Sequence, residues 1–588
     1  MKNLTYLLFL LPVFVLAQQK AFPTAYGGGA YVSGGRGGNV YHVTNLSNDG
    51  STTGSFRWAL AQPRPATIIF DVSGIWEFVG NLHITGANLT IAGQSAPQGG
   101  VTLTPEGSNN YSFEIKIAEN IIIRYLRVRG NWNGTRNAFR VNPSSNSETR
   151  YSRNHIFDHM SLSYSGLQGF SVTREDTHNI TFQNGLIAES KTGALFGDTN
   201  PTSAGFSYDN TFRTTLFYNI PHRTPNSSSG RADIYNNVRY DWTNRFSTFK
   251  TNALVNHFNN YTFTGNKTTL FTQWQSQDPV WQVNGVTNEN PNLPPSIYAA
   301  GNIVQDLFED PSADNQFLFI EHAFSGQTER VPSELFRDTP HAMIGAVPST
   351  IMTALQASVA VPPEAGANKY LNADGTYGVY RDPQDTRYVA NTIADTPEPW
   401  SCCNSGANSN RHSAIAGQPY TDFLASITGS PINTRSANYY VSNPHIPEAY
   451  LVAKGITGNS TIHNQVQPSG YTLLEEFLNG VDGDVEIINR PIITLNGSSV
   501  LTLTLGSSYN ELGAVANDEE DGNLTSSIVI NSNLDMNTPG TYEVKYNVDD
   551  TDGNSAIEVI RTVIVASEST PSVTGGATRK AKFIIINN

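Results

Sequence analysis

Short apolar strands recur at irregular intervals in the first half of the chain, and this pattern constrains the fold most. Each run is rich in β-branched and aromatic residues and ends at a turn signal, as strands do. The runs are TIIFDVSG, NLTIAGQSA, NIIIRYLRVRG, NHIFDHMSLSYS, NITFQNGLIAES, TTLFYNI, ADIYNNVRY and ALVNHFNNYTF. They begin roughly 18 to 35 residues apart, as expected for coils of short strands joined by loops of varying length. The sequence therefore predicts an all-β fold, a right-handed parallel β-helix, because a sandwich or a propeller explains this irregular spacing less well.

Asparagine recurs at the expected corners of these coils. Asn120, Asn154, Asn179, Asn236 and Asn237 each lie within one of the runs. Asparagine tolerates the left-handed backbone of a tight corner. We expect these side chains to stack in ladders along the axis of the β-helix.

The N-terminus and the composition predict an extracellular protein. Residues 1–17 contain Lys2, the apolar run LLFLLPVFVLA and a small-residue cut site after Ala17, which is typical of a secretory signal peptide. The run is too short to span a bilayer comfortably, so a membrane anchor is disfavoured. We expect a monomer that is secreted to the periplasm or the medium. Asp and Glu outnumber Lys and Arg by 50 to 36, and this net charge of −14 argues against nucleic acid as a partner.

The character of the sequence divides the mature chain into three parts. Residues 18–488 are expected to form the β-helix domain, with late coils and long loops in the Pro-, Asn- and Gly-rich part after residue 266. Residues 489–566 are expected to form a small antiparallel β-sandwich, because TYEVKYNV alternates as a strand with one solvated face does. Residues 567–588 are expected to be a disordered tail. Asp518 to Asp521 could bind calcium or form a solvated acidic turn.

One loop places basic residues between two strands. Residues 218–240 read YNIPHRTPNSSSGRADIYNNVRY, in which two prolines and a glycine interrupt strand-like segments and leave Arg223 in the loop. Arg223 could meet an acidic sugar or solvate a turn. His222 has an ordinary pKa of roughly 6.5, so it could act as a base or serve the turn structure. Arg231 and Arg239 could grip a carboxylate in the same groove, or pair with a neighbouring aspartate.

Seven segments, in this order, resemble secreted bacterial pectate lyases of polysaccharide lyase family 1. They are GGRGGNVYHVTNL, IIFDVSG, IAGQSAP, IIIRYLRVRG, IFDHMSLSYS, the loop around Arg223 and IYNNVRYDW. SGYTLLEEFLNGV, residues 469–481, resembles the closing segment of the same proteins, and residues 491–565 resemble bacterial immunoglobulin-like modules. The resemblance implies a polysaccharide lyase that cleaves an acidic uronate polymer, most directly pectate, by β-elimination.

The resemblance also implies roles for single residues. Arg223, in Arg-Thr-Pro, stands where the family has its catalytic base, although an arginine pKa above about 12 requires surroundings that raise its deprotonated fraction. Lys191, in ESKTGALFG, stands at a substrate-binding position, and we expect His222 and Arg231 to bind substrate beside it. Asp158 and Glu189 match metal-ligand positions, so calcium is a possible cofactor. The alternative is a structural role for Asp158 and a surface role for Glu189.

The chain departs from the family pattern at several charged positions. Asn137 stands where an aspartate is common, and Gly166, Leu167 and Gln168 stand where acidic residues are common. Asn226 replaces a second basic residue of the loop. These changes leave open a lyase for another uronate polymer, or a β-helix that binds polysaccharide without cutting it. A glycoside hydrolase would need paired carboxylates roughly five to ten Å apart, and the predicted strands offer no compelling pair.

Overall fold

The structure is a computed structural model, and it divides into two compact units, Met1–Glu486 and Ile487–Asn588. Among the helices of the described residues, none is long and apolar enough to cross a membrane. The structure describes residues 18–567 except 108, 132–133, 143–150, 174–176, 198–207, 221–222, 229, 243–246, 250–251, 266–280, 284–293, 307, 313–314, 316–318, 323–327, 331–332, 398–424, 426, 428–430, 483–490, 519–520, 552–554 and 557.

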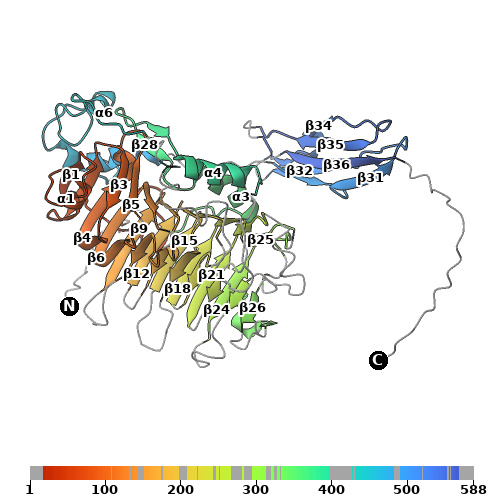
Figure 1. Ribbon diagram of the computed structural model, residues 1–588, viewed down its shortest axis with the longest axis horizontal. Helices are drawn as coiled ribbons and strands as arrows, with labels where there is room; N and C mark the ends of the chain where they lie inside the picture. Colours follow the sequence, from red (N-terminus) through yellow and green to blue (C-terminus); the bar gives the residue numbers. More distant parts are fainter. Residues whose placement is uncertain are drawn as a thin grey trace, which may run out of the picture. The chain divides into compact units, whose positions relative to one another are not determined.

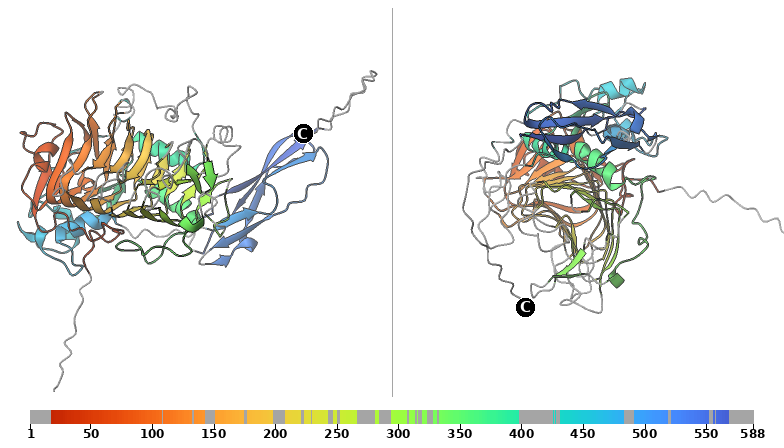
Figure 2. Two further views of the ribbon diagram at one scale, coloured as in Figure 1. Left: turned by 90° about the horizontal axis from the view of Figure 1, so that it is seen from below. Right: turned by 90° about the vertical axis from the view of Figure 1, so that its right-hand side faces the viewer.

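The first unit is a right-handed parallel β-helix whose successive coils lie side by side along one axis (Figures 1 and 2), as the strand spacing predicted. Three ladders of parallel strands run along it. The first contains β1(Asn39–Val43), β2(Ala66–Phe70), β4(Leu82–Ala92), β6(Phe113–Arg124), β9(Ser152–Asp158), β12(Thr177–Gln183), β15(Tyr208–Arg213), β18(Gly230–Tyr235), β21(Ala253–Phe258) and β24(Ser296–Ala300).

The other two ladders complete each coil. The second contains β3(Gly74–Phe78), β5(Val101–Pro105), β7(Leu126–Arg129), β10(Ser161–Ser163), β13(Leu186–Ala188), β16(Leu216–Tyr218), β19(Val238–Tyr240), β22(Tyr261–Thr262) and β25(Ile303–Val304). The third begins in the first halves of β4 and β6 and continues with β8(Phe139–Val141), β11(Gln168–Val172), β14(Thr192–Phe196), β17(Asn226–Ser227), β20(Thr248–Phe249), β23(Trp281–Val283) and β26(Phe319–His322).

Aromatic side chains fill the interior of the coils. Phe139 and Phe170 stack at 5.8 Å between ring centroids, and Phe182 stacks on Phe212 at 5.0 Å. All four rings are fully buried. Each such ring removed from water contributes roughly 1.5 to 3 kcal/mol, so this stack stabilises the register of successive coils.

Asparagines occupy the corners as expected, in two distinct ways. Asn120, Asn154 and Asn179 have φ of 63°, 58° and 55°, in the left-handed region. Asn237 instead belongs to a buried ladder, in which its backbone N–H and its side-chain amide both donate to Asn260 Oδ1 at 3.0 Å. The first set lies outward at the surface, and the second satisfies backbone groups inside the coil.

Helices cover the second ladder, which corrects the expectation of only coils and loops after residue 266. α3(Ala354–Glu364) begins at a capping box formed by Thr353 and Gln356, and α4(Pro383–Ile393) begins at the N-cap Asp382. Apolar residues of both helices pack against β13, β16 and β19. Other α-helices in the described part of this unit are α1(Phe56–Leu60), α6(Glu448–Ala453) and α7(Leu473–Leu478).

The second unit is built from antiparallel strand pairs and one parallel pair. Its strands are β30(Ile492–Leu495), β31(Val500–Thr504), β32(Ala514–Asp518), β33(Gly522–Asn523), β34(Val529–Ser532), β35(Gly540–Asn547) and β36(Val559–Ala566). Alternate residues of β35, Val544 and Tyr546, are buried, as the TYEVKYNV pattern predicted. In the acidic turn, Asp521 accepts hydrogen bonds from the N–H and the hydroxyl of Thr551.

Burial of His155 should make the β-helix sensitive to acid. His155 is fully buried in β9 with Nε2 2.8 Å from Ser152 Oγ, and burial lowers its pKa to about 3. An unfolded histidine titrates near 6.5, so the unfolded chain gains a proton that the folded chain excludes. Above pH 6.5 the histidine is neutral in both states, and the free energy of unfolding is unaffected. As pH falls from 6.5 toward 3, only the unfolded chain takes up the proton, and the free energy of unfolding decreases by on the order of 4 kcal/mol.

Denaturant unfolding at pH 7 and pH 4 measures this effect. We expect His155→Gln to lower stability at pH 7 and to reduce the difference between the two pH values. An unchanged pH difference in the variant would mean that other groups cause the acid sensitivity.

Candidate functional site

Backbone contacts with the neighbouring coil hold Arg223 in place. Arg223 lies between β16 and β17 with φ of 65°, and its carbonyl oxygen accepts a 2.6 Å hydrogen bond from the backbone N–H of Ala194 in β14. A Cβ on Gly193 would lie 2.3 Å from that oxygen, so the close approach requires glycine there. The loop that the sequence singled out is therefore fixed by β14.

The side chain of Arg223 is largely removed from water. Its Nε is buried and has no hydrogen-bond partner among the described residues. Burial lowers the pKa of Arg223 below its usual value, because desolvation disfavours the charged form. A guanidinium in this state is better able to give up a proton than a solvated one.

Arg239 lies beneath the loop and holds the residue that follows Arg223. It is buried; its Nε and Nη2 donate to Thr224 O at 3.0 and 2.7 Å, and Nε also lies 3.0 Å from Thr224 Oγ1. Burial lowers the pKa of Arg239 to about 9. These contacts of Arg239 are with the loop that carries Arg223, and they hold Thr224 in place.

Lys191 comes to the same edge of the β-helix as Arg223. It immediately precedes β14, and its backbone N–H donates to Ser165 O at 3.0 Å. The pairing of β14 with β11 and of β11 with β8 aligns Lys191 with Leu167 and Arg136 on the two preceding coils. We call Arg136, Asn137, Leu167, Gln168, Lys191, Thr192 and Arg223 the entry edge, since each stands at or just before a strand of the third ladder.

Arg136 is a cation that the sequence analysis missed. It is half-buried at the entry edge, two coils from Lys191, which at a strand spacing of about 4.8 Å places the two residues roughly 10 Å apart along the axis. The sequence feature that could have identified Arg136 is its position directly before Asn137, which stands where an aspartate is common. The entry edge thus offers basic side chains on three coils.

Neutral side chains separate these cations. Asn137 is buried, and its Oδ1 accepts a hydrogen bond from the backbone N–H of Gln168 at 3.1 Å, while its Nδ2 donates to Ser171 Oγ at 2.6 Å. Gln168 and Thr192 occupy the aligned positions of the next two coils. Asn137 and Gln168, two of the positions where carboxylates were expected, are therefore amides, and Thr192 adds a hydroxyl.

Asp158 is a structural ion-pair partner. Its fully buried carboxylate accepts hydrogen bonds from Arg124, Gln183 and Asn184, each at 2.9 Å. Burial alone would raise the pKa of Asp158, but His159 and Arg124 hold it well below its usual range. The same Arg124 guanidinium bonds Asp482, which ties the end of this unit to β6.

Glu189 has partners on α4. Its Oε2 accepts hydrogen bonds at 2.8 Å from Arg387 Nη2 and from the hydroxyl of Tyr388. The carboxylate of Glu189 is buried. Burial of the Tyr388 hydroxyl, together with the nearby charge of Glu189, raises the pKa of Tyr388 well above its usual value. Glu189 therefore anchors the covering helix, and the structure does not place it with Asp158 in a shared ligand set.

The remaining predicted residues do not join the entry edge. His222 lies outside the described residues. Arg231 is on β18 of the first ladder, where its Nε makes a 2.9 Å ion pair with Asp209. Asp233, an aspartate near these arginines, accepts hydrogen bonds from the backbone N–H of Ile344 and from Asn256 Nδ2.

Comparison with known proteins supplies the family. Residues 493–565 match a family model described as "Bacterial surface protein, Ig-like domain". The chain is 32% identical over 335 residues to "Probable pectate lyase C" of Emericella nidulans, which covers 54% of this chain and 73% of that protein. The chain belongs to the pectate lyase family. A "Probable pectate lyase C" of Aspergillus flavus is 34% identical over 225 residues, covering 38% of this chain and 48% of that protein.

The comparison with solved structures gives a partial match. The cedar pollen allergen jun a 1 is 17% identical, covers 58% of this chain and 92% of its own, and superposes with a TM-score of 0.42.

In the described part of the chain, Asp158 and Glu189 do not fit a calcium site, because each carboxylate is already paired with an arginine. Calcium takes six to eight oxygens, typically several from Asp or Glu. Asp158 and Glu189 are each bonded to arginines, and Asn137 and Gln168 carry no charge. Among the described residues no three His, Cys, Asp or Glu side chains gather in a way that could hold a metal ion. The described positive charges of the entry edge belong to Arg136, Lys191 and Arg223.

The contact between Arg239 and Thr224 predicts a loss of turnover when it is removed. Arg239→Met keeps most of the volume but leaves Thr224 O without its guanidinium donors, so the Arg223 loop should shift. We expect kcat on polygalacturonate to fall about 10- to 100-fold with KM changed far less. Arg239→Lys, which keeps a single cationic donor nitrogen, should recover part of kcat. If KM rises while kcat stays constant, Arg239 contributes to substrate binding instead.

Proposed function

We propose that this protein is a secreted lyase that cleaves an acidic uronate polymer, most directly pectate, by β-elimination with Arg223 as the base. One observation carries the proposal: among the described residues, the partly desolvated Arg223, whose buried Nε has no hydrogen-bond partner, stands at the same edge as Arg136 and Lys191, with neutral side chains between these cations. Such a site suits a substrate that brings its own negative charges.

The chemistry follows from that arrangement. Neutral Arg223 takes the proton from the carbon beside the uronate carboxylate, the electron pair of that C–H bond forms a carbon–carbon double bond, and the glycosidic C–O bond breaks. The leaving oxygen receives a proton from solvent. Negative charge develops on the uronate carboxylate, and Lys191 and Arg136 would stabilise it electrostatically. No step is assigned to calcium.

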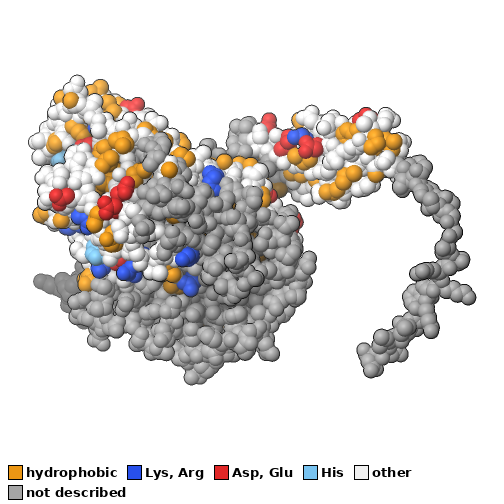
Figure 3. Space-filling model, in the orientation of Figure 1, with side chains coloured by type: hydrophobic (Ala, Val, Ile, Leu, Met, Phe, Trp, Pro, Cys, Tyr) orange, Lys and Arg blue, Asp and Glu red, His pale blue; other side chains and the backbone are white. Residues whose placement is uncertain are grey.

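The local character of the basic edge supports this assignment. The chain has a net charge of −14, and the described Lys and Arg side chains on the face in Figure 3 occur in small groups rather than as one basic field. A polyanion would therefore be attracted to a few sites, of which the entry edge is one.

A binding protein without catalysis is the second candidate, and Asn137 and Gln168 favour it because both replace possible charged groups. Product analysis decides between the two. The full chain is incubated with polygalacturonate, and the oligomers are weighed by mass spectrometry. A lyase yields products one water lighter than saturated oligomers. Saturated oligomers alone would indicate hydrolysis, and an intact polymer would indicate binding without cleavage.

The organisation of the secreted protein is part of the proposal. Residues 1–17 would be removed as a signal peptide, residues 18–488 would form the catalytic unit and residues 489–566 the immunoglobulin-like module, followed by a disordered tail at 567–588. The mature protein would act outside the cytoplasm as a monomer. Residues 1–17 and 568–588 lie outside the described residues, as does His222, which we retain as a substrate-binding residue at the loop.

A further inference from the structure

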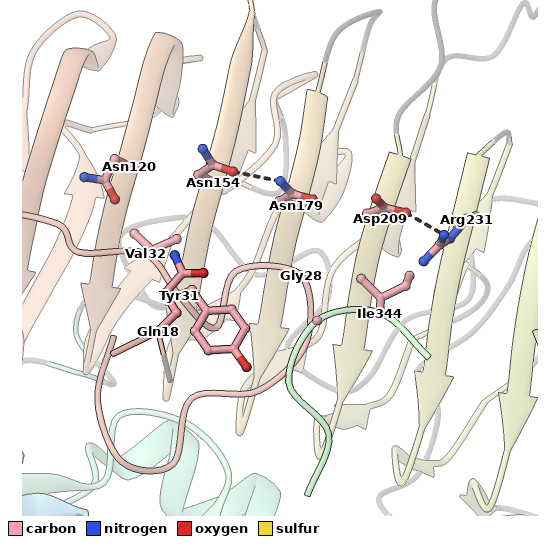
Figure 4. A pocket seen from close by; sticks show the side chains of 11 residues that line it. Gln18, Gly28, Tyr31, Val32, Asn120, Asn154, Asn179, Asp209, Arg231 and Ile344 are labelled. Carbon is pink, nitrogen blue, oxygen red and sulfur yellow. Dashed lines mark hydrogen bonds and ion pairs between the residues drawn. The ribbon is translucent and has the colours of Figure 1, made fainter. Parts of the chain in front are cut away.

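A polar pocket lies on the outer face of the first ladder, away from the entry edge. It encloses about 320 Å³. Its floor is one aligned row of side chains on successive strands, and its walls are the N-terminal segment around Gly28 and Tyr31 and the segment at Ile344 (Figure 4). The row consists of Asn120, Asn154, Asn179, Asp209 and Arg231.

Hydrogen bonds hold the walls of this pocket. Asn120 Oδ1 accepts from the backbone N–H groups of Ser33 and Gly34 at 2.8 and 3.2 Å. On the other side, buried Asp233 accepts from the backbone N–H of Ile344 at 2.7 Å. The two walls meet where a Cβ on Gly345 would lie 2.0 Å from Gly27 O. The pocket is therefore part of the folded framework.

The amides of the row keep hydrogen-bonding capacity. Asn179 Nδ2 donates to Asn154 Oδ1 at 2.8 Å, and Asn154 Nδ2 donates to Glu119 at 3.2 Å. Each of these bonds uses one of the two N–H donors of its amide. Successive amides are spaced by the strand separation of about 4.8 Å, which is close to the length of one pyranose unit. Such a row suits the hydroxyls of consecutive sugars.

A charged pair closes one end of the row. Arg231 makes its ion pair with Asp209 through Nε, and both side chains remain about one-third exposed, at 38% and 34%. A guanidinium has five N–H donors, so its terminal amino groups can still engage a carboxylate in a forked contact. The pocket thus combines amides for hydroxyls with one cation, Arg231, and its partner carboxylate, Asp209.

We propose that this pocket is a second, non-cleaving binding site for a short acidic saccharide, with a carboxylate on Arg231 and hydroxyls on Asn154 and Asn179. It would hold part of the polymer, or a released oligomer, while the entry edge cuts. The choice of a galacturonate probe rests on the proposed function. The inference that the pocket binds a saccharide rests on its own side chains.

Calorimetric titration of the full chain with a saturated galacturonate trimer tests the site. The titration uses the Arg223→Ala background, so that the probe is not cleaved. Arg231→Gln removes the cation. Arg153→Gln is the matched control, because Arg153 lies on the same ladder and pairs with Glu119 but does not line the pocket. Asn179→Gly removes one amide from a position with φ of 55°, which glycine adopts freely.

We expect two binding events, one at the entry edge and one at the pocket. Arg231→Gln should weaken binding at the pocket at least tenfold, and Asn179→Gly should weaken it less. Arg153→Gln should leave both affinities unchanged. A carboxyl-reduced trimer should lose the Arg231-dependent event. The absence of any Arg231-dependent event, seen as an Arg231→Gln titration that matches the Arg153→Gln one, would overturn the proposal. If the protein proves not to be a lyase, the Arg231-dependent event should still be present. Failure of the proposed function is therefore distinguishable from failure of the pocket proposal.

Discussion

Replacing Arg223 with alanine should reduce the formation of unsaturated product from polygalacturonate by at least 10³-fold while the protein stays folded. General base catalysis contributes typically 10² to 10⁴ in rate, and the same side chain also supplies positive charge beside the developing carbanion. Arg223 makes its only described backbone anchor through its own carbonyl oxygen, which alanine retains. The loss should therefore fall on kcat.

Two variants sharpen this prediction. Arg223→Lys keeps a cation but shortens the side chain and removes the guanidinium geometry, so we expect activity near that of the alanine variant. Arg153→Ala, which removes a surface arginine of the first ladder, should retain full activity. Both proteins should melt within a few degrees of the unmodified chain. An Arg223→Ala protein with more than a tenth of the original kcat would exclude Arg223 as the base.

Replacing Asp158 with alanine should cost the β-helix about 3 to 5 kcal/mol of stability. The change removes one of the two carboxylates paired with buried Arg124, which then keeps only Asp482, and it leaves the amides of Gln183 and Asn184 without their Asp158 acceptor. Thermal unfolding of the full chain would show this as a large decrease in Tm. Glu119→Ala is the matched control, because Glu119 pairs with exposed Arg153, and it should cost about 1 kcal/mol or less.

The same experiment separates the two roles considered for Asp158. If Asp158 serves structure, added calcium should leave the Tm difference between Asp158→Ala and the unmodified protein unchanged. A calcium-induced rise in Tm of the unmodified protein that Asp158→Ala abolishes would instead identify the carboxylate as a metal ligand.

Local sequence features predicted the coils well because they depend on short-range physics. The strand runs needed only their apolar content and turn signals, and the left-handed Asn120, Asn154 and Asn179 needed only the tolerance of asparagine for that backbone. Arg223 stood out by its place between two strands. These inferences required no knowledge of which segments meet across the fold.

The missed features depend on contacts between segments distant in the sequence. Arg239 lies beneath the Thr224 loop, and nothing in its own strand distinguishes an arginine that faces inward from one that faces a groove. Glu189 is taken by Arg387, which is 198 residues further along the chain. Helix α3 was missed because it contains Pro362 and Pro363, residues that normally indicate a loop.

The measurement that tests the central claim most directly is the ultraviolet absorbance of unsaturated uronate, followed while the purified protein acts on polygalacturonate in the presence of a calcium chelator. If Arg223 abstracts the proton and Lys191 and Arg136 stabilise the charge, the absorbance should rise with chelator present and should stay flat with Arg223→Ala. Absorbance that rises only when calcium is restored would contradict the assignment of charge stabilisation to these side chains, and absence of any rise in either condition would contradict the lyase itself.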